Sequence, residues 1–227
     1  MPAGDPPRPT SIGLRFEQHG ITLRPEQQAA LERYLGLLTK WNKTLNLTAL
    51  KLDPLADEAI DRLLVEPVLA AQFVSAIRGP AAREMLVDVG SGSGSPAIPL
   101  KISVPGVDLV MVESRIRKSA FLRDAIRLVG LERAEVQAVR LEQLVLEPRF
   151  RESVTWVSVR AVRADSGLWQ AISAILALSG RVLWFRSQSD APGASETGYL
   201  PAFQLEDVRP LIPERRSELA ILRRRGL

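Results

Sequence analysis

The stretch Met85-Leu86-Val87-Asp88-Val89-Gly90-Ser91-Gly92-Ser93-Gly94-Ser95-Pro96 decides the fold of this chain. Met85 to Val89 form a short apolar run before a turn signal, which is typical of a strand buried on both faces of a parallel sheet. The alternating glycines allow a sharp turn and a close approach of the backbone to a ligand. A helix is expected from about Ser95, with Pro96 in its first turn, where a missing N–H costs nothing. The stretch therefore predicts a nucleotide-type binding cradle.

The spacing of the glycines narrows the choice of ligand. A dinucleotide fingerprint would need a third glycine where Ser95 stands, and a phosphate-binding loop would need a lysine before Lys101. The hydrolase pattern G-x-S-x-G is also absent from this stretch. What remains, Asp88-x-Gly90-x-Gly92-x-Gly94, resembles the first motif of class I S-adenosylmethionine-dependent methyltransferases. In that family the acid before the first glycine lies near the methionine end of the cofactor. A glycine-rich turn without a ligand is the alternative.

A second apolar run, Val107 to Glu113, supports the first. It ends in an acid, and a carboxylate at a strand end can accept both hydroxyls of a bound ribose. Glu113 follows Gly90 by 23 residues, close to the spacing of about 20 typical of such a βαβ unit. The alternative role for Glu113 is that of a helix-capping or surface acid.

Composition excludes several kinds of chemistry. The chain has 227 residues, 46% of them hydrophobic, which suits one sizeable domain with an extension. It has no cysteine and a single histidine, His19, so thiolate or histidine metal clusters and a cysteine nucleophile are excluded. Residues 1–11 lack the apolar core of a signal peptide, and no apolar run reaches membrane-spanning length. We expect a soluble, cytoplasmic protein without a bound metal.

Basic residues outnumber acidic ones, giving a formal net charge of +4 from 25 arginines and 5 lysines against 26 acids. This excess alone is weak support for nucleic-acid binding, so local clusters matter more. Arg115, Arg123 and Arg127 are spaced by multiples of four and are expected to share one helix face. The run 223–225 is three arginines, which could be a solvated tail or an RNA clamp.

The first 80 residues show helical patterns only. An amphipathic helix is expected over Pro25 to Lys40, followed by a loop with Trp41 and Leu45 in the core. One or two further helices are expected over 54–78, interrupted near Pro67. Residues 1–80 are therefore predicted to be a helical extension, and residues 81–227 the core domain.

The rest of the chain alternates strands and helices. Ser114 is expected to cap a helix that ends at Gly130, with Ile116, Phe121, Ile126 and Val129 facing inward. Further strands are expected at 134–139, 154–159 and 181–185, with a helix at 168–178. After a low-complexity linker at 187–198, residues 199–208 and 218–224 can form a closing hairpin. The predicted fold is α/β, a doubly wound, mostly parallel seven-stranded sheet with a Rossmann-like core.

Three segments sharpen the resemblance beyond the superfamily: Trp41-Asn42 with 46–49 (Asn-Leu-Thr-Ala), the glycine turn continued through Pro96 and Pro99, and Val159-Arg160-Ala161-Val162. Together they resemble the glucose-inhibited division protein B family over roughly residues 25–186. That family consists of bacterial methyltransferases that methylate guanine N7 in small-subunit (16S) ribosomal RNA. The resemblance implies S-adenosyl-L-methionine as cofactor and ribosomal RNA or the small subunit as partner. We expect the protein to be a monomer.

The motifs and the resemblance together imply a set of site residues. The expected cofactor-binding residues are Asp88, Gly90, Ser91, Gly92, Gly94, Glu113, Ser114, Leu141, Glu142 and Arg160. The expected catalytic residues are Asn46, Thr48 and Arg160. Arg160 could instead form a strand-end salt bridge, and Thr48 could instead cap a helix. Guanine N7 has a free lone pair, so its methylation needs no general base, which suits a chain with one histidine and no cysteine.

Several positions depart from the family pattern. They are Ser95 and Ala97 in the loop, Glu58 for a histidine, Val139 for the glycine that begins the segment next to the adenine, and Arg186 for a lysine. Arg123, Arg127 and Arg186 are candidates for contacts with RNA phosphates. The departures leave two other functions open. One is a small-molecule methyltransferase of the same fold, and the other is a non-catalytic RNA- or ribosome-binding descendant.

Overall fold

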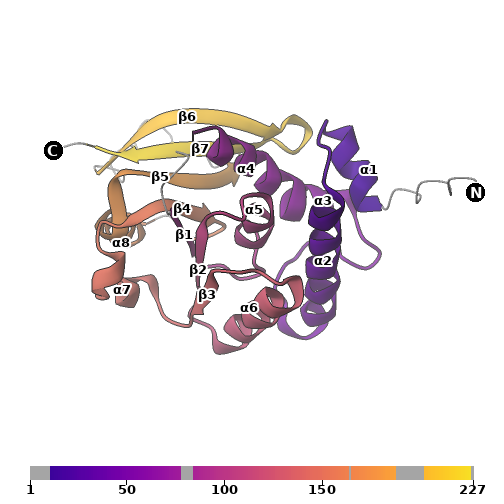
Figure 1. Cartoon of the computed structure of the whole chain (residues 1–227), viewed down its shortest axis with the longest axis horizontal. Coiled ribbons are helices and arrows are strands. Elements are labelled where there is room, and N and C mark those ends of the chain that lie inside the picture. The colour runs from indigo at the N-terminus through magenta and orange to yellow at the C-terminus, as the bar shows by residue number, and fades with distance from the viewer. Residues whose placement is uncertain (1–10, 78–83, 164, 188–201, 226–227) are drawn as a thin grey trace, which may run out of the picture.

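The structure is a computed structural model that describes residues 11–77, 84–163, 165–187 and 202–225. A seven-stranded sheet runs through its centre in the order β3-β2-β1-β4-β5-β7-β6 (Figure 1). Strands β1 to β5 pair in parallel, whereas β7 pairs antiparallel with both β5 and β6. This confirms the predicted doubly wound, mostly parallel sheet. The strands are β1 (Met85–Val89), β2 (Asp108–Val112), β3 (Ala134–Gln137), β4 (Val154–Arg160), β5 (Leu176–Ser187), β6 (Phe203–Ile212) and β7 (Ser217–Arg224).

Helices precede the sheet in the sequence and connect its parallel strands. The α-helices are α1 (Ser11–Gln18), α2 (Pro25–Leu45), α3 (Asp57–Ile60), α4 (Glu66–Ile77), α5 (Ala97–Ser103), α6 (Ile116–Val129), α7 (Leu141–Leu144) and α8 (Ser166–Ile175). A π-helical turn, η1 (Asp61–Val65), joins α3 to α4. Short 3₁₀ turns follow at η2 (Pro148–Phe150) and η5 (Pro213–Arg215).

The strand residues alternate between two hydrophobic cores because successive side chains point to opposite faces of a sheet. One core contains Leu86, Trp156 and Leu183 and is covered by α1, α2, α4, α5 and α6. The other contains Val87 and Val157 and is covered by α7 and α8. Figure 1 shows these two groups of helices on opposite sides of the strands. Each central strand is therefore buried on both faces, as its continuous apolar sequence predicts.

The helices before β1 pack directly on the sheet and on its connecting helices. The rings of Phe73 in α4 and Trp156 in β4 meet edge to face at 6.4 Å between centroids. Trp41 in α2 and Phe121 in α6 do the same at 6.1 Å. The expected boundary between extension and core lies within 78–83, outside the described residues. The N-terminal helices and the sheet thus share one continuous core.

The start of α6 differs from the expectation. Ser114 does not cap it, and the helix begins at Ile116 after Arg115 in the N-cap position. No side-chain hydrogen bond caps the helix at Arg115, whose own backbone N–H donates to Oε1 of Glu113 at 2.8 Å. Ile116 is 79% exposed, so its expected inward position is wrong. The end of the helix at Gly130 is confirmed, with a left-handed φ of +75°.

Other boundaries shift by a few residues. Helix α2 continues to Leu45 rather than ending near Lys40, and α8 ends at Ile175 because β5 already begins at Leu176. The hairpin forms between β6 and β7, while the linker and the residues before 202 lie outside the described part of the chain. Arg224 pairs with Glu152 at 2.7 Å, and Arg225 donates to the carbonyl of Phe203. These contacts tie both side chains to the protein, and the choice between a solvated tail and an RNA clamp stays a prediction.

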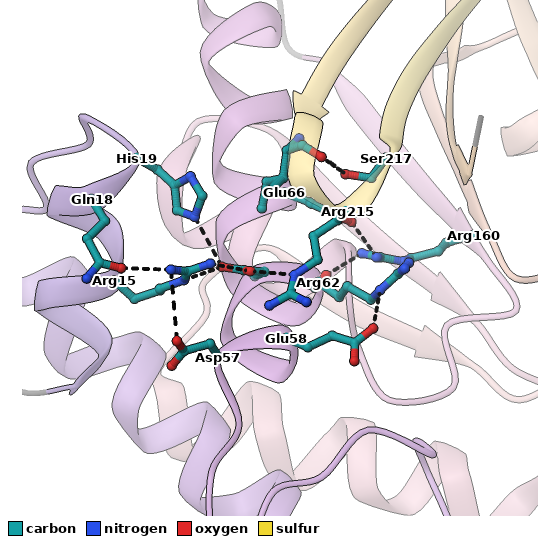
Figure 2. Close-up of polar contacts among 12 residues, drawn as sticks. Arg15, Gln18, His19, Asp57, Glu58, Arg62, Glu66, Arg160, Arg215 and Ser217 are labelled. Atoms are coloured by element: carbon teal, nitrogen blue, oxygen red, sulfur yellow. Dashed lines mark hydrogen bonds and ion pairs between the residues drawn. The ribbon is translucent and has the colours of Figure 1, made fainter. Parts of the chain in front are cut away.

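A buried carboxylate ties three distant segments together beside α4. Asp61 is fully buried and accepts hydrogen bonds from Arg15 of α1 at 2.6 Å and Arg215 of η5 at 2.9 Å. His19 lies 3.1 Å from its other oxygen. Figure 2 shows Arg15, His19 and Arg215 converging from separate segments. Burial acts to raise the pKa of Asp61, but these hydrogen bonds outweigh it, and the pKa is lowered.

We expect Asp61→Asn to lower the free energy of unfolding by about 3 kcal/mol. The change removes the buried negative charge and leaves the charged side chains of Arg15 and Arg215 without their ion-pair partner. The measurement is urea unfolding at pH 7. Because the folded-state pKa of Asp61 is lowered, its contribution is present at neutral pH and is lost as the pH falls through that pKa. Asp57, 71% exposed and 4.0 Å from Arg15, provides the control Asp57→Asn, which should cost less than about 1 kcal/mol. Equal effects of the two variants would contradict the role of Asp61.

Candidate active site

The glycine turn after β1 adopts conformations that only glycine accepts easily. Gly90, Gly92 and Gly94 have φ values of +70°, +48° and +85°. A Cβ on Gly90 would lie 2.8 Å from the side chain of Val162, and one on Gly94 would lie 2.6 Å from Ile98. At these two positions the turn therefore needs glycine for packing as well as for backbone conformation.

Glu113 holds this turn against the end of β2. Its Oε2 accepts a hydrogen bond from the backbone N–H of Gly92 at 3.1 Å, while Oε1 accepts from Arg115. The N–H groups of Gly90 and Ser91 donate to the carbonyl of Val112 at 2.9 and 3.1 Å. The first and second motifs of the sequence thus meet at adjacent strand ends, where ligands bind in open α/β sheets.

A cavity of about 300 Å³ opens at these strand ends. Gly90, Glu113 and Ser114 line it from the glycine turn and β2. The remaining walls are the segment 139–142 at the start of α7 and the segment after β4, with Val162, Arg163, Asp165 and Leu168. The structure therefore brings together five of the expected cofactor-binding residues, namely Gly90, Glu113, Ser114, Leu141 and Glu142.

The residues after β4 were missed by the sequence reasoning, although the resemblance included Val162 itself. Ala161 has a left-handed φ of +50°, which is uncommon for a residue with a side chain. This conformation lies directly between β4 and the segment that covers Gly90. No motif in this part of the sequence signals cofactor binding, so only the fold shows that Val162, Arg163, Asp165 and Leu168 form one wall of the cavity.

Asp88 lies buried at the end of β1, on the opposite face of the sheet from Val89. Its Oδ1 accepts a hydrogen bond from the hydroxyl of Ser158 at 2.6 Å. Its Oδ2 is buried and has no hydrogen-bond partner among the described residues. Burial raises the pKa of Asp88 to about 6, against the hydrogen bond from Ser158, which lowers it. A buried carboxylate oxygen without a partner fits a ligand that brings a hydrogen-bond donor or a positive charge.

Arg160 forms the strand-end ion pair that was its alternative role. Its Nη2 lies 2.5 Å from Oε2 of Glu66, and its Nη1 donates to the carbonyl of Arg62. Figure 2 shows Arg160 turned toward the α3–α4 segment that carries both partners. Burial lowers the pKa of Arg160, while the charge of Glu66 acts to raise it. Arg160 does not line the 300 Å³ cavity.

Asn46 and Thr48 occupy the loop after α2. Asn46 is exposed and ends the helix in a left-handed conformation with φ 48°, a role that asparagine fills well. The side chain of Asn42 holds both backbone groups of Thr48, at 2.9 and 3.1 Å. The hydroxyl of Thr48 accepts from the N–H of Leu50. Asn42 therefore orders this loop, and neither expected catalytic residue lines the cavity.

Two of the departures from the family pattern are buried in the glycine loop. Ser95 donates its hydroxyl to the carbonyl of Leu63 at 2.9 Å, and Ala97 begins α5 without exposed surface. Glu58 pairs with Arg62 at 3.1 Å. Val139 lines the cavity.

Arg186 cannot contact RNA phosphates as expected. Its side chain is 7% exposed and pairs with Glu218 at 2.7 Å, because β5 places it in the interior next to β7. Arg123 and Arg127 are exposed on α6, although Arg127 also pairs with Asp124 at 2.8 Å.

The described residues contain neither a candidate metal site nor a candidate membrane-spanning helix. Within the described ranges no group of histidine, cysteine, aspartate or glutamate side chains could hold a metal ion. In the same part of the chain no helix is long and apolar enough to span a membrane.

Solved structures of other proteins share this fold. A variant of MtNAS in complex with S-adenosylmethionine superposes with a TM-score of 0.58 at 12% identity, covering 95% of this chain and 77% of that one. The mitomycin 7-O-methyltransferase MmcR gives a TM-score of 0.57 at 15% identity, covering 98% of this chain and 74% of that one. At these identities the likeness shows the fold alone.

Sequence relatives identify the family. Ribosomal RNA small subunit methyltransferase G of Cupriavidus pinatubonensis is 33% identical over 197 residues, covering 85% of this chain and 82% of the relative. The protein of the same name from Stenotrophomonas maltophilia is 33% identical over 208 residues, covering 90% of each. The profile of the GidB family, rRNA small subunit methyltransferase G, matches residues 27–206. The chain therefore belongs to the GidB family of S-adenosylmethionine-dependent methyltransferases.

Proposed function

We propose that this protein transfers a methyl group from S-adenosylmethionine to N7 of a guanine in 16S ribosomal RNA of the small ribosomal subunit. The observation that carries the proposal is the meeting of the glycine turn and Glu113 at one cavity, in a chain of the GidB family. The relatives named above are ribosomal RNA methyltransferases of the small subunit. Methylation of guanine at N7 is the activity known for that family.

The residues present fit the cofactor. Glu113 stands at the end of β2, where its carboxylate can accept the ribose hydroxyls, and 139–142 form the wall next to it for the adenine. Asp88 offers the unpartnered Oδ2 for the ammonium group of the methionine end. When bound, the cofactor supplies an electrophilic methyl group on its sulfonium. The protein has to bind it, orient it and exclude water.

The target nitrogen needs positioning rather than proton transfer. N7 attacks through its own lone pair, so the protein must hold it about 3–3.5 Å from the methyl carbon and in line with the breaking bond. Positive charge develops on the guanine, and an isolated cation nearby would oppose it. Because Arg160 is paired with Glu66, the pair adds little net charge to this strand end. We propose that the base approaches here, between Arg160 and the Asn46–Thr48 loop.

Exposed arginines would bind the phosphates of the RNA backbone. Arg163, with a side chain 92% exposed, and Arg140 line the mouth of the cavity. Arg123 and Arg127 are also exposed, but they lie on α6, which covers the other face of the sheet, so they are separate candidates for phosphate contacts. Arginine binds phosphate through paired N–H groups, and each such contact makes affinity fall with salt. We further infer that the protein acts in the cytoplasm, where ribosomes assemble, and that it acts as a monomer.

Two other functions can be distinguished from this one by experiment. A small-molecule methyltransferase would need a substrate pocket closed off from solvent. A non-catalytic descendant would bind cofactor or ribosome without transferring a methyl group. The buried departures at Ser95 and Ala97 make contacts of their own and do not block the cavity, so they favour an active enzyme.

We expect labelled methyl groups to pass from S-adenosylmethionine to 16S RNA when small subunits or naked RNA from an unmethylated strain are incubated with the protein. Digestion and mass spectrometry should place the methyl on guanine N7. The 23S RNA serves as the control substrate. Cofactor binding without transfer to either RNA form would support the non-catalytic descendant, and transfer only to small molecules would support the other rival.

We expect Glu113→Gln to weaken binding of S-adenosylhomocysteine by about 1.5–3 kcal/mol, the range for a hydrogen bond to a charged group. Glutamine keeps an acceptor for the Gly92 or Arg115 amide, so the turn should hold its shape. Isothermal titration calorimetry measures the change. Glu206→Gln is the control, since Glu206 forms an exposed pair with Arg181 on the hairpin edge. Unchanged affinity in folded Glu113→Gln would remove Glu113 from the ribose site.

We expect affinity for S-adenosylhomocysteine to rise about tenfold between pH 5 and pH 7. The pKa of Asp88 is raised to about 6, so below that pH its carboxyl group is neutral and attracts an ammonium group less. Raising the pH through this pKa ionises it and strengthens binding, which then levels off. Calorimetry in buffers of different ionisation enthalpy should detect the released proton. Asp88→Asn should bind weakly without this pH dependence, whereas Asp165→Asn, at an exposed acid that lines the 300 Å³ cavity, should keep it.

A further inference from the structure

Pro67 stands one residue into α4, directly after the π-turn η1. In an α-helix the carbonyl of residue i accepts from the N–H four residues later. The N–H of Glu66 instead donates to the carbonyl of Asp61, five residues back. Proline has no N–H, so residue 67 donates to no carbonyl. As a result the carbonyl of Arg62 loses both its α-type donor, Glu66, and its π-type donor, residue 67. The carbonyl of Leu63 loses its α-type donor for the same reason.

Two side chains from the active site take these two carbonyls. Arg160, at the end of β4, donates through Nη1 to the carbonyl of Arg62. Ser95, at the end of the glycine turn, donates its hydroxyl to the carbonyl of Leu63 at 2.9 Å, and this contact is buried. The donors come from two different strand ends, while the acceptors are adjacent residues of one turn. The turn therefore fixes the two strand ends relative to each other.

Neighbouring contacts strengthen the same turn. Glu66, the residue that follows it, is buried and pairs with Nη2 of Arg160. Asp61, its first residue, is held by Arg15 and Arg215 (Figure 2). Both ends of the turn are thus anchored by ion pairs, so its freed carbonyls occupy defined positions. π-turns of this kind often occur at functional sites.

We propose that Pro67 is a positioning residue of the active site: it leaves the Arg62 and Leu63 carbonyls free, and these hold Arg160 and the Ser95 end of the glycine turn. This inference rests on the proposed function for the role of the strand ends. The physical consequence is pre-organisation, since a turn already held in its bound shape loses less freedom when the cofactor binds. An amide N–H at position 67 would compete with Arg160 and Ser95 for the same carbonyls.

The test measures binding of S-adenosylhomocysteine by calorimetry to the full chain. Pro67→Ala, which restores the N–H, should weaken binding about threefold to tenfold, the effect of one lost hydrogen bond. Ser95→Ala should weaken it by a similar factor. The double variant should bind about as well as Pro67→Ala alone, because that change already releases the contact that Ser95→Ala removes. Pro67 contacts no part of the cavity, so weaker binding has to be transmitted through the turn.

Two controls separate positioning from general stability. Pro25→Ala changes a proline in the first turn of α2. Ser103→Ala removes a hydroxyl that donates to the carbonyl of Pro99 within α5. Both should leave the dissociation constant unchanged, whatever they do to urea unfolding. Unchanged affinity in folded Pro67→Ala, or independent effects that multiply in the double variant, would overturn the proposal.

Ser95→Ala keeps the inference falsifiable if Pro67→Ala does not fold. A Ser95→Ala protein that binds as tightly as the parent would show that the Leu63 carbonyl does not position the turn. Binding is the readout throughout, so a protein that binds cofactor but does not methylate RNA would contradict the proposed function without affecting this test.

Discussion

The attachment of the glycine turn on two sides is the constraint on which the rest of the site depends. From the sheet, Glu113 accepts the N–H of Gly92. From the N-terminal helices, the hydroxyl of fully buried Tyr34 donates to the carbonyl of Ser93 at 2.8 Å, and Ser95 bonds to the π-turn. Consecutive residues of one turn are therefore held by opposite parts of the fold. A loop with three left-handed glycines has high conformational entropy when free, so these bonds are what define its shape.

The same attachment explains why the helices before β1 belong to the working site. They supply Tyr34, the π-turn and Glu66, which contact the glycine turn and Arg160 from one face of the sheet. The cavity beside Glu113 lies on the other face, between β2, α7 and the segment after β4. Asp88 lies between these two regions, because it is the residue before the last in β1, and the glycine turn follows that strand directly. The N-terminal helices therefore hold the glycine turn without lining the cavity.

The sheet was predictable from the sequence because each parallel strand is a short apolar run. The glycine turn in addition indicates a connection from a buried strand to a helix. Glu113 and Gly90 were predictable for the same reason, as their spacing follows from the βαβ unit. The partners of Arg160, Arg186 and Asp61 were not, because ion pairs between residues 32 to 154 positions apart leave no local pattern. The cap of α6 was predicted at Ser114 from its residue type, but the helix begins only at Ile116, and the N–H of Arg115 before it bonds to Glu113.

Arg160 at the end of β4 is positively charged, and its ion pair with Glu66 reduces the net charge there. A free guanidinium next to a guanine that gains positive charge would disfavour the reaction, yet a neutral residue could not donate hydrogen bonds in the same way. Pairing with Glu66 cancels most of the charge and leaves further N–H groups of the planar guanidinium available. The ring of Phe185, 5.6 Å from Arg160 Cζ, covers the guanidinium from the sheet. A base that approaches this strand end, as proposed above, would therefore meet little net positive charge next to its reacting nitrogen.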